Sequence, residues 1–287
     1  MKGRAARRCQ LKTPKAGNLA SNPEELKVKN TSRNQYGRFA GVYDKMDADR
    51  HSRLMVDYTF RIMSKLEIEA TDVLDVCCGT GSAVKAFADH RYNVAGLDQS
   101  REMLAVAKQK LAGTGAVLYR KSLPRFEIKK GGRAKGVRQF DLVTSYFDSL
   151  NYMLTAKDLK SAFQSVAKHT RPGGWFVFDM NTPHALKYMW DDDIHATDSK
   201  ELSTIWVNEF DEKTGIATCY AGFFVKKRGN VWERFDETHY ERAYANGHIR
   251  KMLRETGFTV RGFYRCFYFE PPTNTTNRIC VVAQRKK

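Results

Sequence analysis

The sequence has few prolines, few cysteines and no long hydrophobic run, and each scarcity excludes a class of protein. Seven prolines and 20 glycines in 287 residues, of which 42% are hydrophobic, exclude a collagen-like or low-complexity chain. No stretch approaches the roughly 18 apolar residues of a membrane span, and no signal-peptide core precedes a cleavage site. Six cysteines without a C-x-x-C pair are too few for a disulfide scaffold or a zinc knuckle. We therefore expect a reduced, soluble, cytoplasmic protein without a membrane partner or a metal site.

Acidic residues are also scarce, because 32 Asp and Glu face 49 Lys and Arg and leave a formal net charge of +17. Two segments carry most of the excess: residues 1–33 hold nine basic and two acidic residues, and residues 120–138 hold eight basic and one acidic. Such runs mark nucleic-acid partners in some proteins and solvated segments in others. We expect solvated segments, with residues 1–33 as a disordered basic tail. An RNA partner and an organellar targeting segment are the alternatives.

Strand and helix patterns alternate along the first two thirds of the chain. Apolar residues at helical spacing predict helices over 55–66, after Ser82, after Ser100 and over 159–167. Short β-rich runs lie between them, at 71–76, 92–97, 117–119, 140–145 and 175–178. This alternation predicts an α/β, Rossmann-like fold, in which a seven-stranded, mostly parallel sheet has helices on both faces.

The pattern changes after Asn181. Three long β segments, at 203–211, 216–227 and 231–241, are separated by turn residues and predict antiparallel strands. A helix near 249–255 and strands at 258–269 and 278–284 then complete the first pattern. We expect an inserted antiparallel β lid or substrate subdomain at 183–242. Residues 34–182 and 243–287 would form the main domain.

The segment V-L-D-V-C-C-G-T-G at 73–81 carries the chemistry. It predicts a strand, a glycine turn and a helix start, where a ligand can approach the backbone closely. Val84 stands where G-x-G-x-x-G would need its third glycine, and no G-K-[ST] follows. Asp98 ends the next strand and is well placed to accept hydrogen bonds from two ribose hydroxyls. The pattern favours a nucleoside without a pyrophosphate, although Asp98 as a plain helix N-terminal acid is the alternative.

Four segments in one order resemble the class I S-adenosylmethionine-dependent methyltransferases. They are V-L-D-V-C-C-G-T-G, V-A-G-L-D-Q-S-R-E-M-L, F-D-L-V-T-S-Y-F-D-S-L-N-Y-M and R-P-G-G-W-F-V-F-D-M-N-T. The resemblance covers residues 36–285. Three further motifs resemble a bacterial branch of small-molecule methyltransferases: Y-x-x-F-A-x-V-Y-D at 36–44, D-S-L-N-Y at 148–152 and R-F-D-E-x-H at 234–239.

This resemblance implies S-adenosylmethionine as the cofactor and a small molecule as the methyl acceptor. The backbone of 77–81 would face the methionine moiety, Asp98 would bind the ribose, and Ser122 stands where such sequences usually have an Asp. The residues implied in cofactor binding are Tyr36, Tyr43, Asp75, Cys77, Gly79, Gly81, Asp98, Gln99, Met103, Ser122, Leu123, Tyr146 and Phe147.

Two residues of the insert are candidates for acid–base catalysis. Strand alternation places Glu237 and His239 on one face, and a His suits removal of a proton from an ammonium or hydroxyl acceptor. We therefore predict both as catalytic, and a surface pair without a role is the alternative. An RNA methyltransferase and an inactive nucleoside-binding protein are the other functional hypotheses. Against the first, the fourth strand ends in S-Y-F-D and lacks the N-P-P-[FYW] tetrad.

Overall fold

The computed structural model describes residues 35–132, 135–190 and 194–287. The tail expected at 1–33 therefore lies outside the described residues, and so does part of the basic segment 120–138. Within the described residues, no helix is both long enough and apolar enough to cross a membrane.

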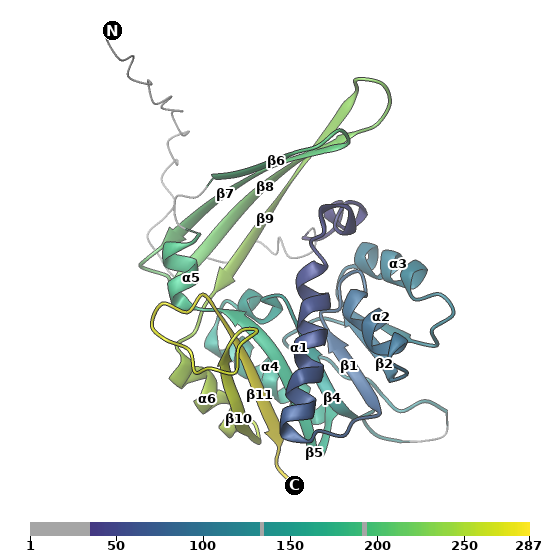
Figure 1. Ribbon diagram of the computed structural model, residues 1–287, viewed down its shortest axis with the longest axis vertical. Coiled ribbons are helices and arrows are strands. Elements are labelled where there is room, and N and C mark those ends of the chain that lie inside the picture. The colour runs from purple at the N-terminus through teal and green to yellow at the C-terminus, as the bar shows by residue number, and fades with distance from the viewer. Residues whose placement is uncertain (1–34, 133–134, 191–193) are drawn as a thin grey trace. The chain divides into compact units, whose positions relative to one another are not determined.

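A seven-stranded sheet forms the centre of the fold (Figure 1). Its strand order is β10-β11-β5-β4-β1-β2-β3, with parallel pairing from β5 to β3 and antiparallel pairing for β10 and β11. This topology confirms the predicted fold class. The strands are β1 Asp72–Val76, β2 Asn93–Asp98, β3 Val117–Arg120, β4 Phe140–Ser145, β5 Thr170–Asn181, β10 Phe258–Arg265 and β11 Arg278–Arg285.

Helices cover both faces of this sheet because successive strand residues point to opposite sides. Val73 and its neighbours on one face pack against α1, α2 and α3, whereas Leu74 and its neighbours on the other pack against α4 and α6. The Ser100 hydroxyl accepts from the N–H of Met103 and caps α3, as its sequence pattern predicts. The helices are α1 Arg50–Leu66, α2 Ser82–Asp89, α3 Arg101–Lys110, α4 Ala156–His169, α5 Pro183–Tyr188 and α6 Asn246–Glu255.

A second, four-stranded antiparallel sheet is formed by the chain between β5 and β10. Its strands are β6 Ile194–Asp198, β7 Leu202–Asp211, β8 Ile216–Lys226 and β9 Trp232–Arg242. Strands β7, β8 and β9 match the three predicted segments. The edge strand β6 was not predicted, because all five residues are exposed and show no apolar alternation. One face of the sheet packs on Phe39 and Val42, which places residues 36–46 between the second sheet and the glycine turn.

Gly96 in β2 has no side chain, and this leaves room for the turn after β1 to pack against the strand. A Cβ added to Gly96 would lie 2.9 Å from Sγ of Cys78, 3.0 Å from Cγ2 of Val84 and 3.1 Å from Cδ2 of Leu118. These three atoms approach from different elements of a close-packed core, so none can move freely.

We expect Gly96→Ala to lower the free energy of unfolding by about 1–3 kcal/mol, the usual cost of overpacking. The matched control is Gly247→Ala near the start of α6, where an added Cβ meets no atom within 4 Å. Urea unfolding of both variants measures the difference. Equal stability of the two variants would contradict the packing argument.

Candidate active site

A cavity lies at the carboxyl ends of β1, β2 and β4, the edge of an α/β sheet where ligands bind. Most residues predicted to bind the cofactor line it. They are Tyr36, Tyr43, Cys77, Gly79, Asp98, Gln99, Met103, Ser122, Leu123, Tyr146 and Phe147. The other four predicted site residues, Asp75, Gly81, Glu237 and His239, do not line the cavity but lie behind its wall.

The glycine turn presents its backbone to the cavity. Cys77 and Gly79 have φ of 61° and 53°, in the left-handed region that a non-glycine residue adopts at a cost. No atom lies within 4 Å of a Cβ added to Gly79, so this backbone is open to a ligand. Gly81 instead packs on α3, where an added Cβ would lie 3.1 Å from Cβ of Ala107.

Asp98 closes the other side of the turn. Its Oδ2 accepts from the N–H of Gly79 at 2.9 Å, and its Oδ1 accepts from the N–H of Ser100 at 2.8 Å. Burial raises the pKa of Asp98, whereas these backbone donors favour the charged form. A carboxylate has about four acceptor sites. Asp98 can therefore hold the turn and still accept hydrogen bonds from two hydroxyls of a ligand.

Asp75 lies beneath the turn. Its Oδ1 accepts from the Thr144 hydroxyl at 2.7 Å, which links β1 to β4. Burial raises the pKa of Asp75 to about 7. This hydrogen bond is with the neighbouring strand, and a role of Asp75 in cofactor binding stays a prediction.

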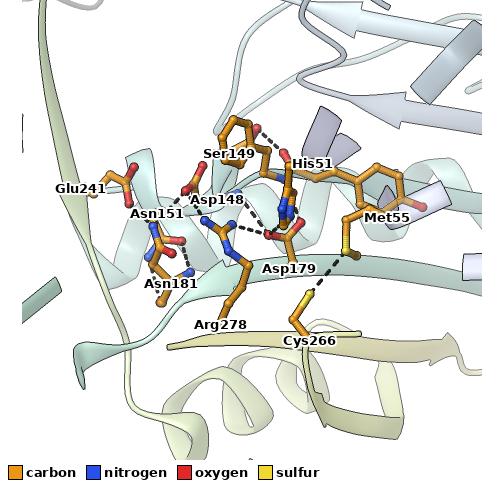
Figure 2. Close-up of polar contacts among 12 residues, drawn as sticks. His51, Met55, Asp148, Ser149, Asn151, Asp179, Asn181, Glu241, Cys266 and Arg278 are labelled. Carbon is orange, nitrogen blue, oxygen red and sulfur yellow. Dashed lines mark hydrogen bonds and ion pairs between the residues drawn. The ribbon is translucent and has the colours of Figure 1, made fainter. Parts of the chain in front are cut away.

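Buried charges fix the loop that follows β4 (Figure 2). Asp179 Oδ1 accepts from the N–H of Phe147 at 2.7 Å, and Arg278 contacts Asp179 at 2.5 Å and Asp148 at 2.8 Å. Burial opposes ionisation of Asp179, but the charge of Arg278 and the contact with His51 lower its pKa to about 2. Phe147 and Asp148 are both left-handed, with φ of 56° and 51°. The ion pairs thus hold a strained turn at the cavity wall.

The same network reaches the second sheet. Asn181 Nδ2 donates to Asp148 Oδ2 and to Glu241 Oε2, both at 2.9 Å (Figure 2). Burial, and then the charge of Asp148, raise the pKa of Glu241 well above its usual range. Asn151 also joins the two parts, since its side chain donates to the carbonyls of Asn181 and Arg242. The network therefore links Asp148, Asp179 and Arg278 at the cavity wall to the end of β9.

Glu237 and His239 lie one layer behind the cavity. The Glu237 carboxylate accepts from the N–H of Tyr36 at 2.7 Å and of Phe39 at 3.1 Å, so it holds the segment that lines the cavity. His239 Nδ1 is 3.0 Å from the Tyr152 hydroxyl, which is 2.7 Å from the hydroxyl of Tyr36. Both tyrosines line the cavity.

Several lining residues were not predicted from the sequence. Ser149 and Met153 follow the strained turn, and Asp49 and Ser52 come from the start of α1. Asp49 accepts from the Ser82 hydroxyl at 2.6 Å, which ties this segment to the glycine turn. The motif at 148–152 is a signal for Ser149, and Met153 follows it directly. Nothing in the sequence pattern distinguishes Asp49 and Ser52 from ordinary helix-start residues.

Comparison with known proteins finds similarity to methyltransferases. A family model described as "Methyltransferase domain" matches residues 73–174. The chain is 29% identical over 252 residues to "Putative methyltransferase YqeM" of Bacillus subtilis (strain 168), covering 88% of this chain and 98% of that protein. It is similar in structure to an S-adenosylmethionine-dependent methyltransferase from Clostridium acetobutylicum ATCC 824, with a TM-score of 0.76, 29% identity, and 87% and 98% of the two chains covered.

A further relative carries a more specific name. The chain is 28% identical over 208 residues to dTDP-3-amino-3,4,6-trideoxy-alpha-D-glucopyranose N,N-dimethyltransferase of Streptomyces venezuelae, covering 68% of this chain and 82% of that protein.

We expect Arg278→Leu to lower the free energy of unfolding by about 3–5 kcal/mol, because Asp148 and Asp179 lose their buried counter-charge. The control is Arg265→Leu, which removes an exposed ion pair with Glu270 and should cost about 1 kcal/mol or less. Urea unfolding near neutral pH compares the two. If Arg278→Leu lowers the free energy of unfolding no more than Arg265→Leu does, the buried ion pairs contribute little to stability.

Proposed function

We propose that this chain, an S-adenosylmethionine-dependent methyltransferase, methylates an amino group of a small molecule. One observation carries the proposal. One cavity joins the glycine turn and Asp98 to the strained loop at Phe147, and the aromatic rings of Tyr36, Tyr43 and Phe147 that line it suit a cation.

The residues present fit the cofactor. S-adenosylmethionine supplies an electrophilic methyl group on a sulfonium. Asp98 has acceptor sites left for the two ribose hydroxyls, and the open backbone at Gly79 suits the methionine moiety. Met103 and Leu123 offer apolar walls for the adenine, near the hydroxyl of Ser122. The rings of Tyr36, Tyr43 and Phe147 are suited to a cation, because an aromatic face attracts positive charge.

The acceptor proposal rests on charge and on one relative. An amine in water is mostly an ammonium ion, and the aromatic rings of the cavity wall attract such a cation. The Streptomyces venezuelae relative is named for N,N-dimethylation of an amino sugar, which is an acceptor of this class.

The protein's own residues position the reactants. The strained loop would align the acceptor nitrogen with the methyl group, and the tyrosines would exclude water. We propose His239 as the group that takes the acceptor's proton. Glu237 holds the backbone of Tyr36 and Phe39, so we assign it a positioning role rather than a direct one.

We expect S-adenosylhomocysteine to bind with a micromolar Kd, and Asp98→Ala to weaken binding by about 100-fold or more. Two charge-assisted hydrogen bonds of about 1.5–3 kcal/mol each would be lost. The control is Asp89→Ala, which removes an exposed ion pair with Lys85 and should leave the Kd unchanged. Calorimetry measures both. Unchanged affinity in Asp98→Ala, or tighter binding of NAD, would overturn the cofactor site.

Methyl-labelled cofactor tests the acceptor. We offer nucleotide-linked amino sugars, other small amines, their hydroxyl analogues and bulk tRNA in parallel, and expect label in the amines alone. Label in tRNA, with binding that falls steeply with salt, would favour the RNA alternative. Tight cofactor binding without label in any acceptor would favour the nucleoside-binding alternative.

A further inference from the structure

The hydroxyl of Tyr152 connects the cavity to the histidine behind it. Tyr152 lines the cavity, whereas His239 is only 4% exposed and does not. The phenol oxygen is 3.0 Å from His239 Nδ1 and 2.7 Å from the hydroxyl of Tyr36. Any proton that reaches His239 from the cavity by this line of hydrogen bonds therefore passes through Tyr152.

The surroundings of Tyr152 and His239 determine which of the two donates in the hydrogen bond between them. Burial, then the neighbouring Tyr36 and Glu241, raise the pKa of Tyr152 well above its ordinary value, so the phenol keeps its proton. His239 Nε2 has no hydrogen-bond partner among the described residues and lies 3.5 Å from Oε2 of Glu237. An unprotonated Nε2 would turn its lone pair toward that carboxylate. A proton on Nε2 avoids this repulsion and leaves Nδ1 free to accept from Tyr152.

We propose that Tyr152 is the catalytic residue that receives the acceptor's proton and passes its own proton to His239. This assignment rests on the proposed function of the same site. The hydrogen on the acceptor nitrogen moves to the Tyr152 oxygen while the phenol hydrogen moves to Nδ1 of His239. The N–H bond of the acceptor breaks and its electron pair becomes the nucleophile. Tyr152 ends neutral, and His239 becomes an imidazolium beside the charge of Glu237.

Tyr36 completes the arrangement from the cavity side. Because Tyr152 donates to His239, its oxygen accepts from the hydroxyl of Tyr36. The backbone N–H of Tyr36 donates to Glu237, the residue that also faces Nε2. Tyr36 and Glu237 thus hold the two ends of the relay without taking up its proton.

The first test reads the tautomer of His239 by nuclear magnetic resonance. The full chain is labelled with ¹⁵N at its histidines and saturated with S-adenosylhomocysteine, and His239→Gln identifies the signal among the 7 histidines. We expect the proton on Nε2. Tyr152→Phe should shift the ¹⁵N signal of Nδ1 toward the value of an imidazole nitrogen that accepts no hydrogen bond. The matched control is Tyr240→Phe, which removes a hydroxyl from the opposite face of β9 and should change nothing.

Two results would overturn the relay in this test. One is a proton on Nδ1 in the unmodified protein, and the other is an Nδ1 signal that Tyr152→Phe leaves unchanged. Neither result depends on knowing the acceptor.

The second test measures single-turnover methyl transfer to the amine found in the acceptor screen. We expect Tyr152→Phe to slow transfer by about 10²-fold, the usual contribution of a general base, while its affinity for S-adenosylhomocysteine stays within about twofold. Tyr240→Phe should keep the full rate. Equal rates in the two variants would overturn the relay, whereas absence of labelled product with the unmodified enzyme would count against the proposed function instead.

Discussion

The guanidinium of Arg278 is buried among acidic side chains where the sheet changes from parallel to antiparallel strands. A buried charge is tolerated only when partners surround it closely, and Asp148 and Asp179 do so from two sides. Asp179 in turn accepts from the N–H of Phe147. One electrostatic requirement therefore decides the path of the loop after β4, including two consecutive left-handed residues that cost free energy by themselves. The cavity wall depends on that loop.

The two sheets are joined by side chains as well as by the chain itself. Asn181 lies between Asp148 and Glu241, so the end of β5 and the end of β9 share one hydrogen-bond network. Glu237 holds the backbone of Tyr36, and the Ser100 hydroxyl donates to the carbonyl of the same residue at 3.0 Å. The segment that lines the cavity is thus attached to both sheets. Displacement of this segment has to break hydrogen bonds on both sides, each with a net contribution of about 1 kcal/mol.

Local patterns in the sequence were enough to predict most of the residues that line the cavity. The glycine turn and Asp98 are each encoded by consecutive residues, and the mainly parallel sheet follows from the alternation of elements. Strand alternation also put Glu237 and His239 on one face, and both are buried while Asp236, which precedes them on the opposite face, is exposed. The pairing of Arg278 with Asp148 joins residues 130 positions apart and has no local signal. The placement of a tyrosine between the predicted histidine and the cavity also arises only from the packing of one sheet on the other.

This placement has an electrostatic reason. In the proposed reaction the acceptor becomes a neutral amine when it loses its proton, but the cofactor stays a cation. An imidazolium formed at the cavity wall would therefore repel the cofactor in a medium where water does not screen it. Because Tyr152 at the wall stays neutral, the new positive charge forms on His239, one side chain further from the cavity. Glu237 lies 3.5 Å from the ring nitrogen that would carry part of that charge. The same carboxylate holds the cavity-lining segment through the N–H of Tyr36. Burial of Glu237 on β9 therefore serves the shape of the cavity and the charge balance of the proton transfer together.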